Sequence, residues 1–390
     1  AGASSYWNPI TFVEDNQSAR PTGDFYYTEA LTRKAIEYID ESAEQTKPFF
    51  LYVAYTAPHY PLHARPATIA KYKGKFDEGW DVLRARRHSR LQEMGMIPPG
   101  TTPTARDDMS RPWQDEPQKE WQAHRMEVYA AMVDHLDAGV GELLRHLQLK
   151  GMLDDTLFLF LSDNGASPED HPGGFIERTG QPWRDPAALP PTRDGRPVRA
   201  GNFYDRLLGS ADTYGSYGAR WANLSNAPFQ RFKAWVHEGG IATPLIAHWP
   251  ARIQSRGGIT HEVGHIVDLM ATCIDLAGAR YPAVAPDGSS LHQPDGRSLA
   301  PIFAGLSREI QPLFWEHEGN RAVRLGRWKL VSEYPGEWQT LRPYPKDGRW
   351  ELYNLDRDRA ETHDLASVHA ENVRELSALY DAWASEAGVV

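Results

Sequence analysis

Two uninterrupted apolar runs, 48–55 and 156–161, constrain the fold of this 390-residue chain more than any other feature. Runs of this length without alternating polar residues are typical of strands buried on both faces of a sheet. Helical spacing of apolar residues precedes each run, over 31–39 and over 126–147, and a third short run follows at 244–249. Because helices alternate with fully apolar strands, we expect an α/β fold with a mainly parallel sheet sandwiched by helices.

The last part of the chain has a different pattern. Four short strand candidates, separated by turn residues, occur at 313–316, 321–324, 328–331 and 350–353. Helical spacing follows over 373–383. This order predicts a small antiparallel sheet with a helix. We therefore expect an α/β core over 1–305 and a C-terminal α+β subdomain over 306–390.

Composition excludes several classes of protein. The chain carries 42 Lys and Arg against 52 Asp and Glu, a formal net charge of −10, which disfavours binding to nucleic acid. No stretch approaches the roughly 18 uncharged apolar residues that a membrane span needs, so we expect no membrane partner. The single cysteine, Cys273, excludes an internal disulfide and a cysteine-rich zinc module, and its apolar helical surroundings predict a core residue.

Asp163 and Asn164 directly follow the second apolar run. In open α/β sheets, ligands bind beyond the carboxyl ends of the strands. A carboxylate and an amide oxygen are hard ligands that suit Ca²⁺ or Mg²⁺ better than zinc. An ordinary Asp-Asn-Gly turn is the alternative at this position.

His59 follows the first apolar run, between Pro58 and Pro61. Prolines restrict the backbone on both sides, and a rigidly placed imidazole suits proton donation near neutral pH. A purely structural histidine is the alternative, and His63 is a neighbouring histidine of the same kind.

Lys233 lies shortly before a pair of glycines, Gly239 and Gly240, that allow close approach of the backbone. Its ammonium is suited to binding an oxyanion, and an ordinary surface lysine is the alternative. Two long segments of weak periodicity, 75–120 and 165–232, are expected to be loops on the substrate side or irregular surface. Within the second, Tyr214, Tyr217 and Trp221 are candidate pocket walls.

Taken together, these segments resemble the sulfatase family of the alkaline-phosphatase-like superfamily, and its arylsulfatase members in particular. The matching stretches are 47–59, 155–165, 233–244, 327–330 and 351–355, and they span almost the whole chain in family order.

The resemblance implies a role for each candidate. Asp163 and Asn164 look like half of the family's single Ca²⁺ site, whereas two-metal phosphatases of the superfamily carry Asp-His there. His59 resembles the histidine that contacts the sulfate ester and assists departure of the leaving group. Lys233 resembles the lysine that clamps a sulfate oxygen, and His237 would contribute to substrate binding.

The chain also departs from the family pattern. Sulfatases carry an upstream Cys-x-Pro-x-Arg or Ser-x-Pro-x-Arg segment, whose first residue becomes formylglycine, and a Gly-Lys-x-x-His stretch, and neither occurs here. Cys273 is followed by Ile-Asp-Leu-Ala and does not substitute. We therefore expect the formylglycine nucleophile in an N-terminal portion outside these residues, and the 390 residues alone to be inactive.

The resemblance implies a sulfuric ester hydrolase whose substrate is a small sulfate ester or a sulfated sugar. It also implies export to the periplasm or the extracellular space, and it leaves the oligomeric state open. Two alternatives stand beside this reading: a phosphate or phosphonate monoester hydrolase of the same superfamily, and a non-catalytic relative that binds sulfated glycans.

Overall fold

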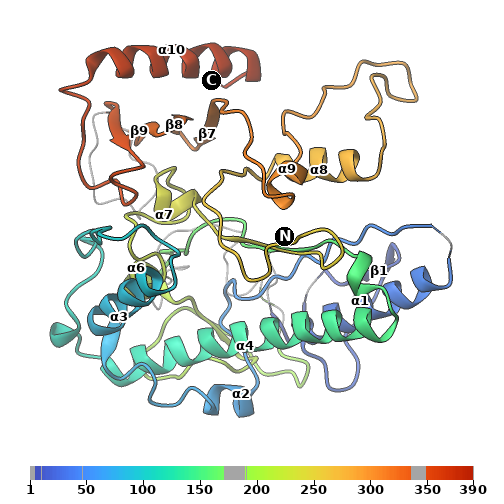
Figure 1. Cartoon of the computed structure of the whole chain (residues 1–390). Helices are drawn as coiled ribbons and strands as arrows, with labels where there is room; N and C mark the ends of the chain where they lie inside the picture. The colour runs from blue at the N-terminus through green and yellow to red at the C-terminus, as the bar shows by residue number, and fades with distance from the viewer. Residues whose placement is uncertain are drawn as a thin grey trace. The chain divides into compact units, whose positions relative to one another are not determined.

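The computed structural model describes residues 5–9, 11–45, 47–170, 189, 191–334 and 348–389. The chain forms two compact units that are interleaved in sequence (Figure 1). Unit 1 contains 1–89, 105–152 and 166–227, and unit 2 contains 90–104, 153–165 and 228–390. The expected division at 305/306 differs from these boundaries and stays a prediction about domains.

Helices dominate unit 1. The two expected helices are confirmed as α1 (Tyr27–Ala43) and α4 (Lys119–Leu149), which pack against each other. The remaining elements among the described residues of this unit are α2 (Pro66–Ala70), α3 (Gly79–Glu93, whose last turn belongs to unit 2), the 3-10 turn η1 (Trp113–Asp115), α6 (Gly218–Ser225), a hairpin of β1 (Val13–Glu14) and β2 (Gln17–Ser18), and the parallel pair β4 (Arg199–Ala200) and β5 (Thr213–Tyr214).

Helix α4 ends at Leu149, and Gly151 follows its C-cap. This residue has a φ of 69°, a left-handed conformation that glycine adopts without steric cost. Its N–H donates to the Gln148 carbonyl at 3.0 Å, and the Met152 N–H donates to the Leu147 carbonyl at 2.9 Å. These two bonds form a Schellman cap, which satisfies carbonyls that the helix leaves unpaired.

Two of the three candidate pocket walls, Tyr217 and Trp221, belong to the core of unit 1, which corrects part of the expected pocket. Trp221 has no exposed surface and packs edge-on against Trp80, with ring centroids 5.3 Å apart. Tyr217 is 6% exposed and stacks on Tyr129 at 4.4 Å. Large rings remove more apolar surface from water than other side chains, so these two fill the interior instead of walling a pocket.

The run 48–55 is extended but forms no strand, and this part of the prediction is wrong. No strand among the described residues pairs with it, and Phe50 and Tyr52 are 78% and 80% exposed. Apolar side chains favour burial, but a strand also needs a neighbouring backbone segment whose N–H and C=O groups pair with its own.

The expected strands 156–161 and 244–249 form one antiparallel pair in unit 2. β3 (Phe158–Leu161) and β6 (Leu245–His248) are in register from Phe158 opposite His248 to Leu161 opposite Leu245. The mainly parallel sheet is therefore not observed, and β4–β5 is the one parallel ladder in the described part of the chain. Apolar runs indicate burial and carry no information on strand direction.

The C-terminal sheet and helix are confirmed. Strands β7 (Leu313–His317), β8 (Asn320–Leu325), β9 (Trp328–Ser332) and β10 (Glu351–Asn354) form an antiparallel sheet in the order β10-β9-β8-β7. Helix α10 (Ala370–Ala387) covers one face, against Val323, Leu330 and Leu352 (Figure 1). Because side chains alternate along a strand, Ala322, Val331 and Tyr353 point to the opposite face, where they pack against Val236 and Ile241.

Unit 2 is completed by the 3-10 turn η2 (Leu153–Asp155) and the helices α7 (Glu238–Ile241), α8 (Asp268–Leu276) and α9 (Ala300–Phe303). Cys273 lies in α8 and is partly exposed, so it is not the core residue expected from its apolar neighbours. Among the residues that the structure describes, no helix has both the length and the apolarity needed to cross a bilayer.

Candidate functional site

Unit 2 brings the predicted metal turn, residues 162–165, next to the segment that contains Lys233. We call this segment, residues 230–244, the lysine segment. β3 ends at Leu161, and β6, which pairs with it, begins at Leu245, so the residues before β6 lie beside those after β3. The Gly165 N–H donates to the Gly240 carbonyl at 2.9 Å, and the Thr243 hydroxyl donates to the Ser162 carbonyl at 2.9 Å. Two segments about 80 residues apart in the sequence are thereby joined on both sides of the turn.

The glycines at this junction permit an unusually close approach of backbones. A Cβ added to Gly165 would overlap the Gly239 carbonyl oxygen. A Cβ on Gly239 or Gly240 would overlap the carbonyl oxygens of Gln230 and Trp235, respectively. The sequence-based interpretation of the glycine pair is therefore confirmed, because no side chain fits between α7 and the chain that wraps it.

Asp163 and Asn164 present oxygen atoms that are not used within the turn. The Asn164 N–H donates to Oδ1 of Asp163 at 3.0 Å, and the Asn164 amide group donates to the Gly165 carbonyl at 2.8 Å. No described residue hydrogen-bonds to Oδ2 of Asp163 or to Oδ1 of Asn164. These hard oxygens fit a cation such as Ca²⁺, which takes six to eight of them.

The described residues supply only part of such a coordination shell. No group of three or more His, Cys, Asp or Glu side chains that could hold a metal occurs within them. The pair is therefore chemically suited to Ca²⁺ as two ligands of a larger set.

Lys233 is half-buried and its ammonium has no carboxylate or carbonyl partner among the described residues. Arg231 and Ala234, on either side of it, have φ values of 66° and 81°. Non-glycine residues in this left-handed region are strained by roughly 1–2 kcal/mol each, and they persist where surrounding contacts hold them. Lys233 is thus a cation on a tightly constrained loop, and none of the described carboxylates pairs with it.

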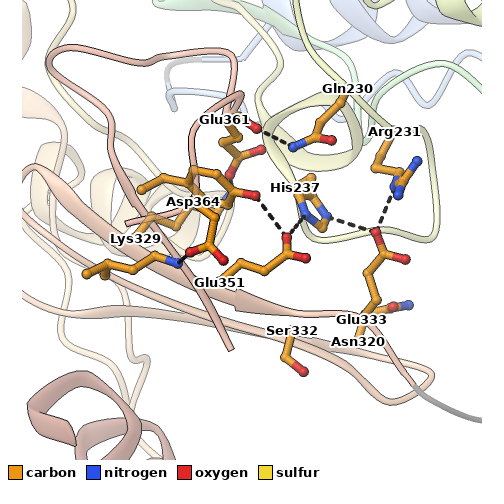
Figure 2. A network of polar contacts seen from close by, with 12 residues as sticks. Gln230, Arg231, His237, Asn320, Lys329, Ser332, Glu333, Glu351, Glu361 and Asp364 are labelled. Carbon is orange, nitrogen blue, oxygen red and sulfur yellow. Dashed lines mark hydrogen bonds and ion pairs between the residues drawn. The ribbon is translucent and has the colours of Figure 1, made fainter. Parts of the chain in front are cut away.

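His237 lies in the interior. It is 1% exposed, its Nε2 is 3.5 Å from Oε2 of Glu351, and its Nδ1 is 4.0 Å from Oε1 of Glu333 (Figure 2). The Tyr353 hydroxyl also donates to Glu351, at 2.8 Å. The structure therefore surrounds this predicted substrate-binding residue with carboxylates of the C-terminal region.

Sequence reasoning missed a second buried charge cluster behind the lysine segment. Lys329, in β9, has no exposed surface, and its ammonium lies 2.9 Å from Glu238 and 2.8 Å from Glu361. Burial lowers the pKa of Lys329, and the carboxylate of Glu361 opposes that shift. The signal in the sequence is a lysine within the otherwise apolar strand Trp-Lys-Leu-Val, where a charged residue is tolerated only with a partner.

His59 belongs to unit 1, where it is exposed. Its carbonyl accepts a hydrogen bond from the Tyr6 hydroxyl at 2.9 Å, and both flanking peptide bonds, Ala57–Pro58 and Tyr60–Pro61, are cis. Its Nδ1 lies 2.7 Å from the Tyr60 carbonyl oxygen, an acceptor, so Nδ1 carries a proton, and no described residue hydrogen-bonds to Nε2.

His63, by contrast, is structural. It is fully buried, accepts the Tyr6 N–H at Nδ1 (3.3 Å), and donates from Nε2 to the Thr213 carbonyl at 2.7 Å. Burial lowers its pKa to about 4, so it is neutral at physiological pH. Its ring nitrogens are both occupied, which leaves His59 as the accessible histidine of this segment.

Comparison with solved structures defines the class of fold. The chain superimposes on the structure of Ps i-CgsB with a TM-score of 0.57 and 21% identity, covering 96% of this chain and 58% of that one. It superimposes on BT4656, solved with its substrate D-glucosamine-2-N,6-O-disulfate, with a TM-score of 0.55 and 17% identity, covering 98% and 73%. The fold is the mixed α/β, alkaline-phosphatase-like fold of the sulfatases.

Sequence comparison identifies the family to which the chain belongs. Residues 2–279 match the family model described as Sulfatase, and residues 229–379 match the C-terminal model of N-sulphoglucosamine sulphohydrolase. The chain belongs to the sulfatase family. It is 32% identical to an uncharacterized sulfatase of Schizosaccharomyces pombe over 379 residues, and 31% identical to the arylsulfatase of Klebsiella aerogenes over 290 residues.

The matches differ in how much of each protein they cover. The first spans 94% of this chain and 63% of the yeast protein, and the second spans 72% of this chain and 58% of the bacterial one. The chain therefore spans about three fifths of the length of these relatives.

Proposed function

We propose that this chain is part of an arylsulfatase-type sulfuric ester hydrolase. The observation that carries the proposal is the junction in unit 2, where an oxygen-bearing turn suited to Ca²⁺ is hydrogen-bonded to Gly240 and Thr243, a few residues after Lys233. The Lys233 ammonium has no partner among the described residues and is therefore available to an anion. Hydrolysis of a sulfate ester concentrates negative charge on the sulfate oxygens and on the leaving oxygen. Cations held in fixed positions stabilise that charge.

Each candidate residue then has a role. Asp163 and Asn164 would supply two of the ligands for Ca²⁺, which neutralises charge on sulfate oxygens when it is bound. Lys233 would bind one sulfate oxygen as a point charge. His59, protonated at Nε2, would give its proton to the leaving alcohol as the S–O ester bond breaks. The nucleophile would be a formylglycine, which none of these 390 residues provides.

His237 enters the proposal indirectly. Its burial between Glu333 and Glu351 supports a role in holding the lysine segment rather than in touching the substrate. We propose that it acts on substrate binding through the position of Lys233.

The test uses the protein expressed from its complete gene, with p-nitrophenyl sulfate and p-nitrophenyl phosphate as substrates. We expect faster turnover of the sulfate, loss of activity with EGTA, and recovery with Ca²⁺. Lys233→Met should lower kcat/KM by about 10²–10³, the usual effect of removing one group that stabilises transition-state charge. Asp163→Asn should raise the Ca²⁺ concentration needed for half-maximal activity.

Matched controls are available in the same chain. Lys71→Met removes an exposed cation paired with Asp134, and Asp275→Asn changes an exposed carboxylate of α8, so neither should change activity. Preferred turnover of the phosphate would instead identify a phosphate monoester hydrolase. Tight calorimetric binding of sulfated sugars without turnover of either ester would identify a binding protein.

The substrate and the location of the protein are part of the same proposal. The relatives include N-acetylgalactosamine-6-sulfatases at 24–25% identity as well as the arylsulfatase, so we propose a small aryl sulfate or a sulfated sugar. Export to the periplasm or the extracellular space rests on the family alone, and fractionation of cells that express the complete gene tests it.

A further inference from the structure

Four charged side chains, of which Lys329, Glu238 and Glu361 are buried and Arg359 is partly exposed, join the C-terminal sheet to the lysine segment. Lys329 contacts Glu238 at 2.9 Å and Glu361 at 2.8 Å, and Arg359 forms an ion pair with the other oxygen of Glu238. Two cations and two carboxylates give the group a net charge of zero. Such a group is stable inside a protein only while it is complete, since removing one member leaves an uncompensated charge.

Strand alternation explains why Lys329 reaches this position. Its neighbour Leu330 points to the face covered by α10, so Lys329 points to the opposite face, together with Val331. Tyr353 lies directly opposite Lys329 in the register of β9 and β10. The face that receives Lys329 is the one that packs against Val236 and Ile241, on either side of Glu238.

Further bonds hold the lysine segment along its length. The Glu361 carboxylate accepts the Glu238 N–H at 2.7 Å. The Glu361 backbone carbonyl accepts the Gln230 side-chain amide at 2.5 Å (Figure 2). The Arg231 guanidinium donates to Glu333 at 2.7 Å, and the Asn320 amide donates to the Ala234 carbonyl at 2.8 Å. Residues on both sides of Lys233 are thus tied to the C-terminal region, whereas the Lys233 side chain makes no such contact with the part of that region that the structure describes.

We propose that Lys329 is a positioning residue for Lys233. By neutralising Glu238 and Glu361 inside the protein, it holds the backbone from Arg231 to Glu238 in its strained form and so fixes where the Lys233 ammonium is presented to an anionic substrate. This inference rests on the proposed function of Lys233. A displacement of about 1 Å at a group that orients a substrate lowers rates as much as 10²-fold, so the effect is measurable.

A double-mutant cycle tests the proposal on the protein expressed from its complete gene. We measure kcat and KM for p-nitrophenyl sulfate in the wild type, Lys233→Ala, Lys329→Met and the double variant. Lys329→Met should lower kcat/KM at least 10-fold in the wild-type background and less than 2-fold in the Lys233→Ala background. Equal losses in both backgrounds would overturn the proposal, because a general loss of stability does not depend on Lys233.

A second variant tests the same proposal if Lys329→Met does not fold. Glu238→Gln keeps the volume of the side chain and removes one charge of the group, and it should show the same dependence on Lys233. Lys71→Met, which breaks an exposed ion pair with Asp134, is the matched control and should show no effect in either background.

Hydrogen exchange separates this inference from the proposed function. In Lys329→Met or Glu238→Gln, the amides of 231–241 should exchange faster, whereas those of α4 should not change. If the wild type turns over no sulfate ester but exchange rises in 231–241, the proposed function fails and the positioning of the segment stands. Unchanged exchange in 231–241 would overturn the positioning role whatever the activity.

Discussion

At the scale of one residue, His63 has a structural role although it lies four positions from the candidate catalytic residue His59. It shares its segment with His59, yet its two ring nitrogens bond to the Tyr6 N–H and the Thr213 carbonyl, and it has no exposed surface. Nothing in the local sequence distinguishes the two histidines, because the ring of His63 bonds to residues 57 and 150 positions away.

The buried state of His63 predicts a loss of stability in mild acid. Its pKa is about 4 in the folded protein and about 6.5 in the unfolded chain, so between these values the unfolded state binds the extra proton. Stability therefore falls as the pH drops from about 6.5 toward 4, and the difference reaches about 2 kcal/mol at pH 5.

Denaturant unfolding at pH 7.5 and pH 5.0 measures this contribution. We expect the wild type to lose about 2 kcal/mol more than His63→Gln over that interval, since the variant lacks the titrating group. His261→Gln, which changes an exposed histidine, should behave like the wild type. An identical pH dependence for wild type and His63→Gln would contradict the assignment.

At the scale of elements, two nearby glycines of α4 have opposite roles. A Cβ at Gly139 would lie 2.5 Å from the Thr32 hydroxyl of α1 and 2.9 Å from the Tyr55 hydroxyl, so α1 and α4 approach closely there. A Cβ at Gly141 would meet only the flexible end of Arg145, at 3.8 Å.

Alanine at these positions should change stability in opposite directions. Gly141→Ala should stabilise the protein by about 0.5–1 kcal/mol, since glycine inside a helix is less favourable than alanine. Gly139→Ala should destabilise it by about 1–3 kcal/mol, because the added methyl forces the two helices apart. Thermal unfolding of both variants checks this, and a stabilising Gly139→Ala would contradict the packing of α1 on α4.

Elements differ in how well their sequence predicts them. Helices α1, α4 and α10 and the C-terminal strands form where their periodicity places them, since their spacing records one buried face each. The run 48–55 does not become a strand, and β3 pairs antiparallel, because partner and direction depend on other parts of the chain. The sequence does not predict the ion pairs of Lys329 for the same reason, since its partners Glu238 and Glu361 lie far away in the sequence.

On the scale of the whole molecule, the apolar residues around α7, before residue 306, share one hydrophobic cluster with the C-terminal sheet that follows it. Val236 and Ile241 are covered by Val331 and Tyr353, and Glu238 is neutralised by Lys329. A polypeptide ending at residue 305 should therefore expose this apolar face and leave Glu238 without its partner. We expect it to bind a hydrophobic dye, to be cleaved rapidly by protease within 228–305, and to lack a cooperative thermal transition in unit 2.

The intact chain is the control for that truncation. A 1–305 polypeptide with protected amides at 231–241 and a sharp unfolding transition would show that the core folds without the last 85 residues. It would also support the predicted domain boundary at 305/306 over the interleaved units.

The long reach of these contacts has a consequence for protein synthesis. The Glu238 N–H donates to the carboxylate of Glu361, which is translated 123 residues later. At about 5–20 residues per second, this synthesis takes about 6–25 s, and only then can the lysine segment contact Glu361. Until then the segment has emerged without the partners that hold it. A product released by a premature stop codon before Glu361 would carry Lys233 without the contacts that hold its segment, so we expect only chains translated beyond Glu361 to present this lysine in place.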